Sequence, residues 1–250
     1  MYLKTQGLVL RETVYRDADK LLTVLTRDYG KMTVKARGVR RAGSRLKAPC
    51  QLLAYSTFTV FVYRGMSTVN EAQTVELFPE LRQDLERLSL ATYFAQVAEV
   101  LSQEDVPTPE LLSLTLNGLY ALSRLGKPQA LVKSAFEFRA ACQAGYTPEL
   151  SGCRDCGQAD ALGFVLQDGC LVCSQHAGPA AQPLTPGALA AMRHIASCPL
   201  GQLFAFRLSP ASQAVLSQVT ERYLLTQLER NFSTLDFYHS LFSGGKSHES

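Results

Sequence analysis

The sequence lacks the features that mark membrane proteins and secreted proteins. No apolar run approaches the roughly 20 residues that cross a bilayer. The first residues, Met1 to Lys4, lead directly into an alternating pattern and not into the apolar core of a signal peptide. With 250 residues, of which 46% are hydrophobic and 19% charged, the chain has material for one or two folded domains. We therefore expect a soluble protein that remains in the cytoplasm.

The motifs of the commonest enzyme classes are also missing. The sequence contains no GxxxxGK[ST] phosphate loop, no GxGxxG, no GxSxG elbow and no HExxH. Tryptophan is absent, and the four histidines are scattered. Asp17 and Asp19 resemble a carboxylate pair, but the neighbouring Arg16 and Lys20 favour a solvated turn. The sequence therefore predicts that the protein is not an enzyme.

Acidic residues are missing from a long part of the N-terminal region. Residues 1–80 hold 13 basic and 7 acidic side chains, a balance of +6. The other 170 residues hold 12 basic and 15 acidic side chains, a balance of −3, so the overall charge of +3 conceals the difference between the two parts. Between Asp28 and Glu71 there is no acidic residue. Such a stretch attracts polyanions and favours a nucleic-acid surface over a merely solvated basic loop. The cations in this gap are Lys31, Lys35, Arg37, Arg40, Arg41, Arg45, Lys47 and Arg64.

The hydrophobic pattern of residues 1–80 is typical of strands. Alternation predicts strands over 3–15, 20–27, from 31 onward, 55–63 and about 67–77. In the third of these, Met32, Val34 and Ala36 are expected to face the core while Lys31, Thr33, Lys35 and Arg37 face outward. In the fourth, Phe58, Val60 and Val62 suit the core. Its other face carries Tyr55, Thr57, Thr59, Phe61 and Tyr63, which either stack on nucleic-acid bases or cover a half-buried barrel exterior. Five short strands with a basic loop between the third and fourth predict an OB-fold barrel.

After Pro79 the period of the pattern changes to that of helices. Leucines and alanines recur every three or four residues from Leu81 to Ala98, and again at Leu112–Leu122 and Leu131–Cys142. Thr108-Pro109, Thr185-Pro186 and Ser209-Pro210 each place a capping hydroxyl before a proline, which predicts helices near 109–125, 186–197 and 210–230. The tail from Ser243 to Ser250 is expected to be disordered. The predicted fold is therefore α+β and multidomain: an OB-fold DNA-binding domain at 1–80 and an all-α helical domain at 81–250.

Four of the seven cysteines have metal-ligand spacing. They form Cys153-x2-Cys156-x13-Cys170-x2-Cys173, flanked by the glycines that tight turns need. Four thiolates saturate a tetrahedral ion, so we predict one structural Zn²⁺ in a zinc finger at about 150–178, inserted in the helical domain. His176, three residues after Cys173, is the second choice for a ligand, and a redox disulfide is the other alternative. Cys50, Cys142 and Cys198 are expected to be buried thiols.

Several of these segments together resemble the RecO family of bacterial DNA repair proteins. The resemblance is carried by Gly7-Leu8-Val9-Leu10-Arg11, by Tyr15–Thr26, by Gly30-Lys31, and by Lys35–Arg41 with Ser44-Arg45-Leu46. It implies a nucleoid-associated recombination mediator that binds single- and double-stranded DNA and anneals complementary strands. It also implies that the protein works with RecR to load RecA on DNA coated by single-strand-binding protein. An acidic, apolar tail of that protein would dock on the helical part. Lys35, Arg37, Arg40, Arg41, Arg45 and Lys47 are the expected contacts to DNA phosphates.

Two other functions remain open from the residues alone. A zinc-ribbon factor that binds RNA or acts in transcription would share the basic barrel and the cysteine cluster. A zinc-stabilised scaffold without a nucleic-acid role would require the basic stretch to be buried against another subunit.

Overall fold

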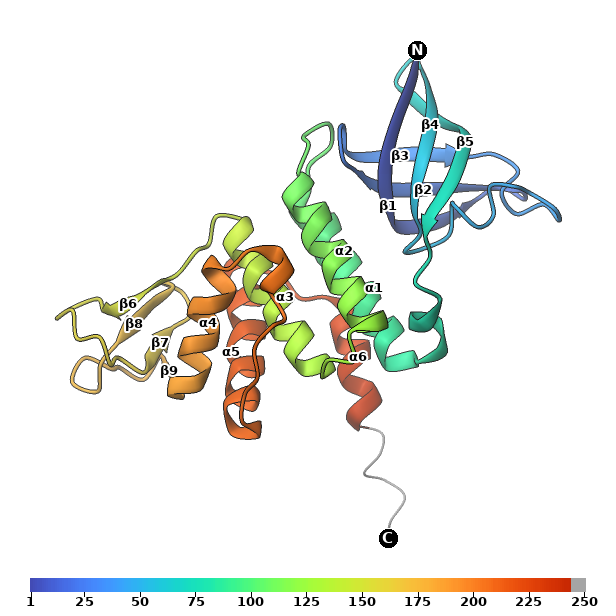
Figure 1. Ribbon diagram of the computed structural model, residues 1–250. Coiled ribbons are helices and arrows are strands. Elements are labelled where there is room, and N and C mark those ends of the chain that lie inside the picture. The colour runs from blue at the N-terminus through green and yellow to red at the C-terminus, as the bar shows by residue number, and fades with distance from the viewer. Residues whose placement is uncertain (244–250) are drawn as a thin grey trace, which may run out of the picture. The chain divides into compact units, whose positions relative to one another are not determined.

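The structure is a computed structural model of the 250-residue chain, and residues 1–243 are described (Figure 1). Its chain forms two compact units. The first, which we call the barrel unit, contains residues 1–124 and the chain from Phe232 onward; the second, the ribbon unit, contains residues 125–231. The tail predicted to be disordered lies, from residue 244 onward, outside the described residues. No helix in the described part of the chain is long and apolar enough to span a membrane.

The barrel unit begins with a closed five-stranded barrel, as predicted, and its strand order is β1-β2-β3-β5-β4. Its strands are β1 (Tyr2–Tyr15), β2 (Asp19–Thr26), β3 (Gly30–Ala36), β4 (Tyr55–Tyr63) and β5 (Met66–Glu76). Only β3 and β5 pair in parallel, and this pairing closes the barrel. Met32, Val34 and Ala36 lie in the core together with Phe58 and Val60. The predicted alternation in the third and fourth strands is therefore confirmed.

Three helices complete the barrel unit: α1 (Leu85–Leu101), α2 (Pro109–Arg124) and α6 (Ser233–Ser243). Gly30, with φ of +67°, forms a β-bridge to Glu104 in the loop between α1 and α2. A Cβ atom on Gly30 would lie 2.4 Å from the carbonyl oxygen of Val106, so this approach of the loop to the barrel requires glycine. The Lys31 ammonium also donates to the carbonyl oxygen of Glu99 at 2.8 Å, which ties α1 to β3.

The helix expected from Leu81 begins later than predicted. Residues Pro79–Gln83 form a short 3₁₀ helix, η1, and α1 starts after Asp84. The reason is that the Asp84 carboxylate caps α1 by accepting a hydrogen bond from the Arg87 N–H at 3.0 Å. Thr185 and Ser209 cap their helices as predicted. The Thr108 hydroxyl does not, since it has no hydrogen-bond partner in the described residues.

The ribbon unit combines three helices with a small sheet. Helices α3 (Gln129–Gln143), α4 (Pro186–Ser197) and α5 (Pro210–Leu228) pack on one another, with the short η2 (Leu200–Gln202) after α4. The sheet has the order β6-β8-β7-β9, with β6 (Glu149–Cys153), β7 (Gly163–Val165), β8 (Cys170–Val172) and β9 (Ala181–Pro183). This sheet carries the cysteine cluster and is the insertion that the sequence predicts in the helical part.

Tyr223 of α5 joins the helices of the ribbon unit to its sheet. Its ring is fully buried between Phe138 of α3 and Phe164 of β7, at centroid distances of 5.8 and 5.3 Å. Its hydroxyl donates to the carbonyl oxygen of Tyr146 at 2.9 Å. The side chains of Arg193 and Gln227 add hydrogen bonds to the carbonyl oxygens of Leu150 and Leu166. The position of the sheet is therefore fixed by α4 and α5.

The change from strands to helices falls between Glu76 and Pro79, next to the domain boundary predicted at residue 80. Helices α1, α2 and α6 belong to the same compact unit as the barrel, because α1 contacts β1 and β2 as well as α2 and α6. The division into domains at residue 80 stays a prediction.

Candidate metal centre and nucleic-acid interface

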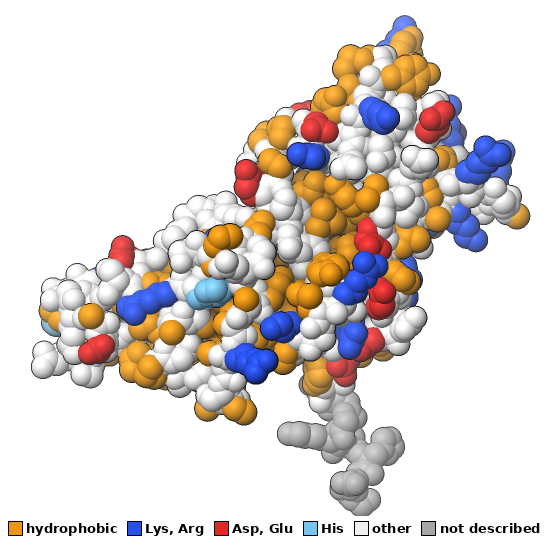
Figure 2. Space-filling model, viewed as in Figure 1, with side chains coloured by type: hydrophobic (Ala, Val, Ile, Leu, Met, Phe, Trp, Pro, Cys, Tyr) orange, Lys and Arg blue, Asp and Glu red, His pale blue; other side chains and the backbone are white. Residues whose placement is uncertain are grey.

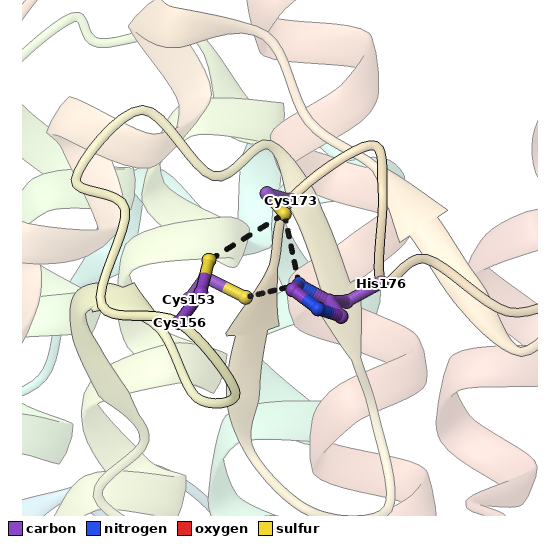
Figure 3. A group of neighbouring side chains, drawn as sticks. All are labelled: Cys153, Cys156, Cys173 and His176. Carbon is purple, nitrogen blue, oxygen red and sulfur yellow. Dashed lines mark hydrogen bonds between the residues drawn. The ribbon is translucent and has the colours of Figure 1, made fainter.

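Three cysteines and one histidine converge at one edge of the small sheet. Cys153 ends β6, Cys156 follows it in the next turn, Cys173 follows β8, and His176 lies in the turn after it (Figure 3). The ligand atoms of these four residues all lie within 4.8 Å of one another. Cys153 and Cys173 are buried, whereas Cys156 and His176 are exposed. The cluster is thus anchored on the sheet and open to solvent on one side.

The two halves of the cluster have similar local structure. The carbonyl oxygen of Cys153 accepts the N–H of Gly157 at 2.7 Å, and that of Cys173 accepts the N–H of His176 at 3.0 Å. Each hydrogen bond closes a tight turn that directs two ligand side chains to the same point. Gly157 adopts φ of +75°, which its missing Cβ allows.

The spacing of the ligand atoms fits a tetrahedral metal ion. With Zn–S of about 2.3 Å and Zn–N of about 2.0–2.1 Å, two sulfurs on a zinc ion lie about 3.8 Å apart and a sulfur and a nitrogen about 3.6 Å apart. In the structure, Cys156 Sγ and Cys173 Sγ are 3.8 Å apart. His176 Nδ1 lies 3.6 Å from Cys153 Sγ and 3.2 Å from Cys173 Sγ. The four residues can therefore hold one metal ion.

The local hydrogen bonds favour thiolates at two of the three cysteines. Burial opposes ionisation of Cys153, but backbone N–H groups of Cys173, Asp155 and Cys156 lower its pKa to about 6. Burial also opposes ionisation of Cys173, whose pKa is lowered by the N–H of Gln175 and by His176. At Cys156 the N–H of Gln158 lowers the pKa, but burial and the two neighbouring sulfurs raise it by more. A metal ion bound here would lower the pKa of the Cys156 thiol and so favour the third thiolate.

Cys170, the other predicted ligand, lies outside this cluster. It is the first residue of β8, is buried, and accepts a contact from the Arg154 guanidinium at 3.5 Å. Cys170 starts β8 and Cys173 lies just after its end, and the ligand atoms that converge around Cys173 do not include the Cys170 sulfur. The structure brings together the other three predicted cysteines with His176, which the sequence left as the second choice.

The predicted DNA contacts lie in β3 and in the loop that follows it. Arg37, Arg40, Arg41, Arg45 and Lys47 are exposed. No carboxylate of residues 1–243 lies within 4 Å of these five cations. Figure 2 shows basic side chains gathered along the right-hand side of the barrel. This group, which we call the loop cations, is free to meet an anion.

Apolar anchors keep the loop of residues 37–54 on the barrel. Val39 and Cys50 belong to the barrel core, and Leu46 packs against that core. The backbone between these anchors turns through successive hydrogen bonds, such as Arg41 N–H to Gly38 O and Ser44 N–H to Arg41 O. Because the apolar residues face inward, the cations between them face solvent.

Lys35 differs from the loop cations because it has a partner. Its ammonium lies 3.0 Å from an Asp19 carboxylate oxygen and 4.7 Å from the ring centroid of Tyr15. The N–H of Gly38 and the Lys35 ammonium both lower the pKa of Asp19. Lys35 therefore holds the β1–β2 turn against the start of the loop.

That turn brings one further cation to the same surface. Arg16 is exposed, has φ of +59° and precedes Asp17 and Ala18. The carbonyl oxygen of Asp17 accepts a hydrogen bond from the Arg40 side chain, and that of Ala18 accepts one from the Arg40 N–H. Arg16 was not among the predicted contacts. It falls before the acid-free stretch and between acidic neighbours in sequence, so only the fold shows that it belongs with the loop.

Fold and site together define an OB-like barrel protein with a basic loop, a helical region and a Cys₃His cluster that can hold a metal. A family model described as recombination protein O N terminal matches residues 1–78, and one described as recombination protein O C terminal matches residues 82–236. The chain belongs to the RecO family of DNA repair proteins.

Curated relatives are similar over nearly the whole chain. The DNA repair protein RecO of Acetivibrio thermocellus is 34% identical over 244 residues, which is 96% of this chain and 97% of that protein. RecO of Heliobacterium modesticaldum is 34% identical over 95% of this chain and 89% of its own length. RecO of Symbiobacterium thermophilum is 30% identical over 95% of this chain and 96% of its own length. The family resemblance drawn from the sequence is thus confirmed.

Proposed function

We propose that this protein is a non-enzymatic recombination mediator, located on the bacterial nucleoid in the cytoplasm. It binds single- and double-stranded DNA, anneals complementary strands and, with RecR, promotes loading of RecA on DNA coated by single-strand-binding protein. The observation that supports this proposal most directly is the set of exposed loop cations without carboxylate partners. They contact phosphates, which carry no sequence information, and a mediator has to act on any strand.

Annealing follows physically from the same charges. Two single strands repel one another through their phosphates, and salt only partly screens this repulsion. A protein that neutralises phosphates on both strands while leaving the bases accessible lowers the barrier to their encounter. No covalent step is needed, so the protein requires no catalytic group for this role.

We further propose that the Cys₃His cluster holds one structural Zn²⁺ through Cys153, Cys156, Cys173 and His176. Four protein ligands leave no coordination position for water or substrate, and this is the pattern of structural and not of catalytic zinc. The ion would hold the turn after β6 to the turn after β8 and so stabilise the small sheet.

The direct test of the proposed function is strand annealing on DNA precoated with single-strand-binding protein, with and without RecR. Annealing is expected to rise with added protein, and RecA loading is expected to need both the protein and RecR. The logarithm of the DNA-binding constant should fall linearly with the logarithm of the salt concentration, because binding releases counterions from the phosphates. Binding that does not change between low and moderate salt, or a strong preference for RNA of the same sequence, would contradict the proposal and favour an RNA-binding factor.

A groove in the ribbon unit is suited to the acidic, apolar tail of single-strand-binding protein. It has a volume of 580 Å³, and its walls include Leu131, Phe206, Leu208 and the cationic side chains of Lys127 and Arg207. No carboxylate in the described part of the chain lies within 4 Å of either cation. Apolar walls flanked by two cations match a peptide that ends in apolar residues next to carboxylates.

Reversing the charge of this groove should remove peptide binding selectively. Arg207→Glu is expected to weaken binding of a synthetic tail peptide at least about tenfold, because it replaces an attraction by a repulsion. Fluorescence anisotropy of a labelled peptide measures this, and Arg230→Glu, which changes an exposed residue shortly after α5, is the matched control. Unchanged peptide affinity in Arg207→Glu, or an equal loss in the control, would place the peptide elsewhere.

A further inference from the structure

Three exposed aromatic side chains form a row on the outer face of the barrel. Tyr2 of β1 pairs with Phe61 of β4, and their ring centroids are 5.0 Å apart. Phe61 and Tyr63 lie two residues apart on the same face, with centroids 6.3 Å apart and ring planes only 8° from parallel. Their exposed fractions are 62% for Tyr2, 36% for Phe61 and 55% for Tyr63. We call this row the aromatic row.

The aromatic row does not serve the core of the barrel. Alternation in β4 places Phe58 and Val60 inside, both at most 2% exposed, and Phe61 and Tyr63 outside. In Figure 2 hydrophobic side chains are visible at the end of the barrel that carries the N-terminus. Aromatic side chains that a fold leaves in water at adjacent positions indicate a surface with a partner.

Cations accompany the aromatic row on both sides. The Arg64 guanidinium lies 5.2 Å from the ring centroid of Tyr63. Lys4 lies two residues after Tyr2 on the same face of β1 and pairs with Thr59 of β4. Neither cation has a carboxylate within 4 Å in the part of the chain that the structure describes. The partner is therefore expected to carry negative charge next to flat apolar groups.

A polar groove lies beside the loop cations, and its lining residues Lys4 and Thr59 are two positions from Tyr2 and Phe61 on the same strands. It has a volume of 390 Å³ and contains Lys4, Thr57 and Thr59 on one side and Arg45 and Leu46 of the basic loop on another. Glu71, which pairs with Thr59 from β5, also borders the groove. Phosphates are expected to keep to the side of Lys4 and Arg45, away from this carboxylate, so bases face the strands.

We infer that the aromatic row is a stacking platform for the bases of single-stranded DNA. The inference rests on the proposed function, in which the loop cations hold the phosphates of the same strand. Residues two apart in a strand are about 6.6–6.8 Å apart, so successive rings can meet successive bases of an extended strand. A duplex hides the faces of its bases. We therefore expect the platform to add affinity for single strands, while the loop cations bind both forms.

Removing the rings should weaken binding to single strands only. The double variant Phe61→Leu, Tyr63→Leu is expected to lose at least about tenfold in affinity for an oligo(dT) strand, since each base stack is worth roughly fivefold to over a hundredfold. Affinity for a duplex, and for an abasic strand of equal length, should stay within about twofold. Fluorescence anisotropy measures all three, and Val75→Thr, an exposed β5 residue, is the matched control. An equal loss on duplex DNA, or no loss on oligo(dT), overturns the platform.

A second variant reports stacking directly and does not depend on a loss of binding. Because the chain has no tryptophan, Tyr63→Trp introduces a single indole on the platform. Its emission should be quenched when oligo(dT) saturates the protein, but not by the abasic strand. An indole whose emission does not change at saturation with oligo(dT) refutes the inference, as does quenching by an apolar peptide but not by DNA.

Failure of the inference and failure of the proposed function give different results. If wild-type protein binds both DNA forms with the expected salt dependence while the ring variants lose nothing, the loop cations hold DNA and the aromatic row does not. If the wild-type protein binds no DNA at low salt, both are wrong.

Discussion

The variant Cys156→Ser is expected to lose its bound zinc and to unfold at a lower temperature than the wild type. The proposed zinc ion would contribute free energy to folding because its four ligands converge only in the native state. For small zinc-finger peptides this contribution is on the order of 10 kcal/mol at pH 7. If about a third of it stabilises the ribbon unit against unfolding, the thermal midpoint should fall by about 7–13 °C, at roughly 2–4 °C per kcal/mol.

The effect should spread along the contacts that join the sheet to the helices. Tyr223 and Gln227 of α5 and Arg193 of α4 all contact the region of the small sheet. Hydrogen exchange should therefore accelerate in β6–β9 and in the facing parts of α4 and α5, and should stay unchanged in the barrel strands. A chelator added to the wild-type protein should produce the same pattern.

Two further variants decide which residues are the ligands. His176→Ala should lose zinc like Cys156→Ser, whereas Cys170→Ala should retain one ion per chain, because Cys170 contacts Arg154 and not the cluster. Zinc content by atomic emission on protein purified without chelator is the measurement. Retention by His176→Ala together with loss by Cys170→Ala would restore the four-cysteine site expected from the sequence.

The sequence contains signals that could have predicted the position of Cys170 outside the cluster. Asp168-Gly169 is a hairpin turn signal, and Cys170-Leu171-Val172 after it is an apolar strand, so Cys170 belongs to the strand. Ser174 and Gln175 are polar, as expected for a tight turn between two ligands. Counting CxxC pairs selects Cys170 with Cys173 and omits the equally spaced pair of Cys173 and His176. The register of a strand distinguishes them.

The barrel strands could be predicted because the pattern that indicates each strand lies within that strand's own residues. Strict alternation in Lys31–Arg37 and Tyr55–Tyr63 fixes which residues face inward, and a closed sheet follows from the number of short strands. The aromatic row could be predicted only in part. The sequence indicates Phe61 and Tyr63, but Tyr2 joins them through the β1–β4 register, which pairs it with Phe61, 59 residues later in the chain.

Buried charge is the feature that the helical periodicity did not predict. Lys133 and Glu137 of α3 lie one turn apart with nitrogen and oxygen 2.7 Å apart, and both side chains are nearly inaccessible. Glu221 of α5 adds a second carboxylate oxygen at 2.5 Å from the Lys133 ammonium. Charges at these positions suggest an exposed helix face. Only the packing of α3 on α5 supplies the partner that makes their burial tolerable.

The double variant Arg40→Glu, Arg41→Glu is expected to lose DNA binding and annealing together, by at least about a hundredfold at moderate salt. Each substitution removes a cation and adds an anion on a surface where no carboxylate of the described residues offsets the loop cations. Phosphate contacts dominate affinity for nucleic acid, and their loss weakens binding to all sequences alike. Single- and double-stranded DNA should therefore be affected similarly, unlike in the aromatic-row variants.

The neutral counterpart Arg40→Gln, Arg41→Gln gives a sharper measure of the contacts. For single strands the slope of log K against log salt is about −0.7 per phosphate contact, so losing two contacts should reduce its magnitude by about 1.4. The Arg40 N–H to Ala18 O bond is a backbone contact and survives either substitution, whereas the hydrogen bond from the Arg40 side chain to the Asp17 carbonyl oxygen is lost. The backbone bond and the apolar anchors Val39, Leu46 and Cys50 are expected to keep the loop in place. Circular dichroism and the thermal midpoint check this.

A change of net charge alone must be separated from a change at the loop. The control Arg222→Glu, Arg230→Glu alters the net charge by the same four units on α5 and the residues after it, in the ribbon unit. Long-range steering depends on total charge and would weaken both variants, whereas contact with phosphates depends on position. Strong loss in the loop variant with little loss in the control locates the phosphates at Arg40 and Arg41. Full binding by a folded loop variant would mean that DNA lies on another surface of the protein.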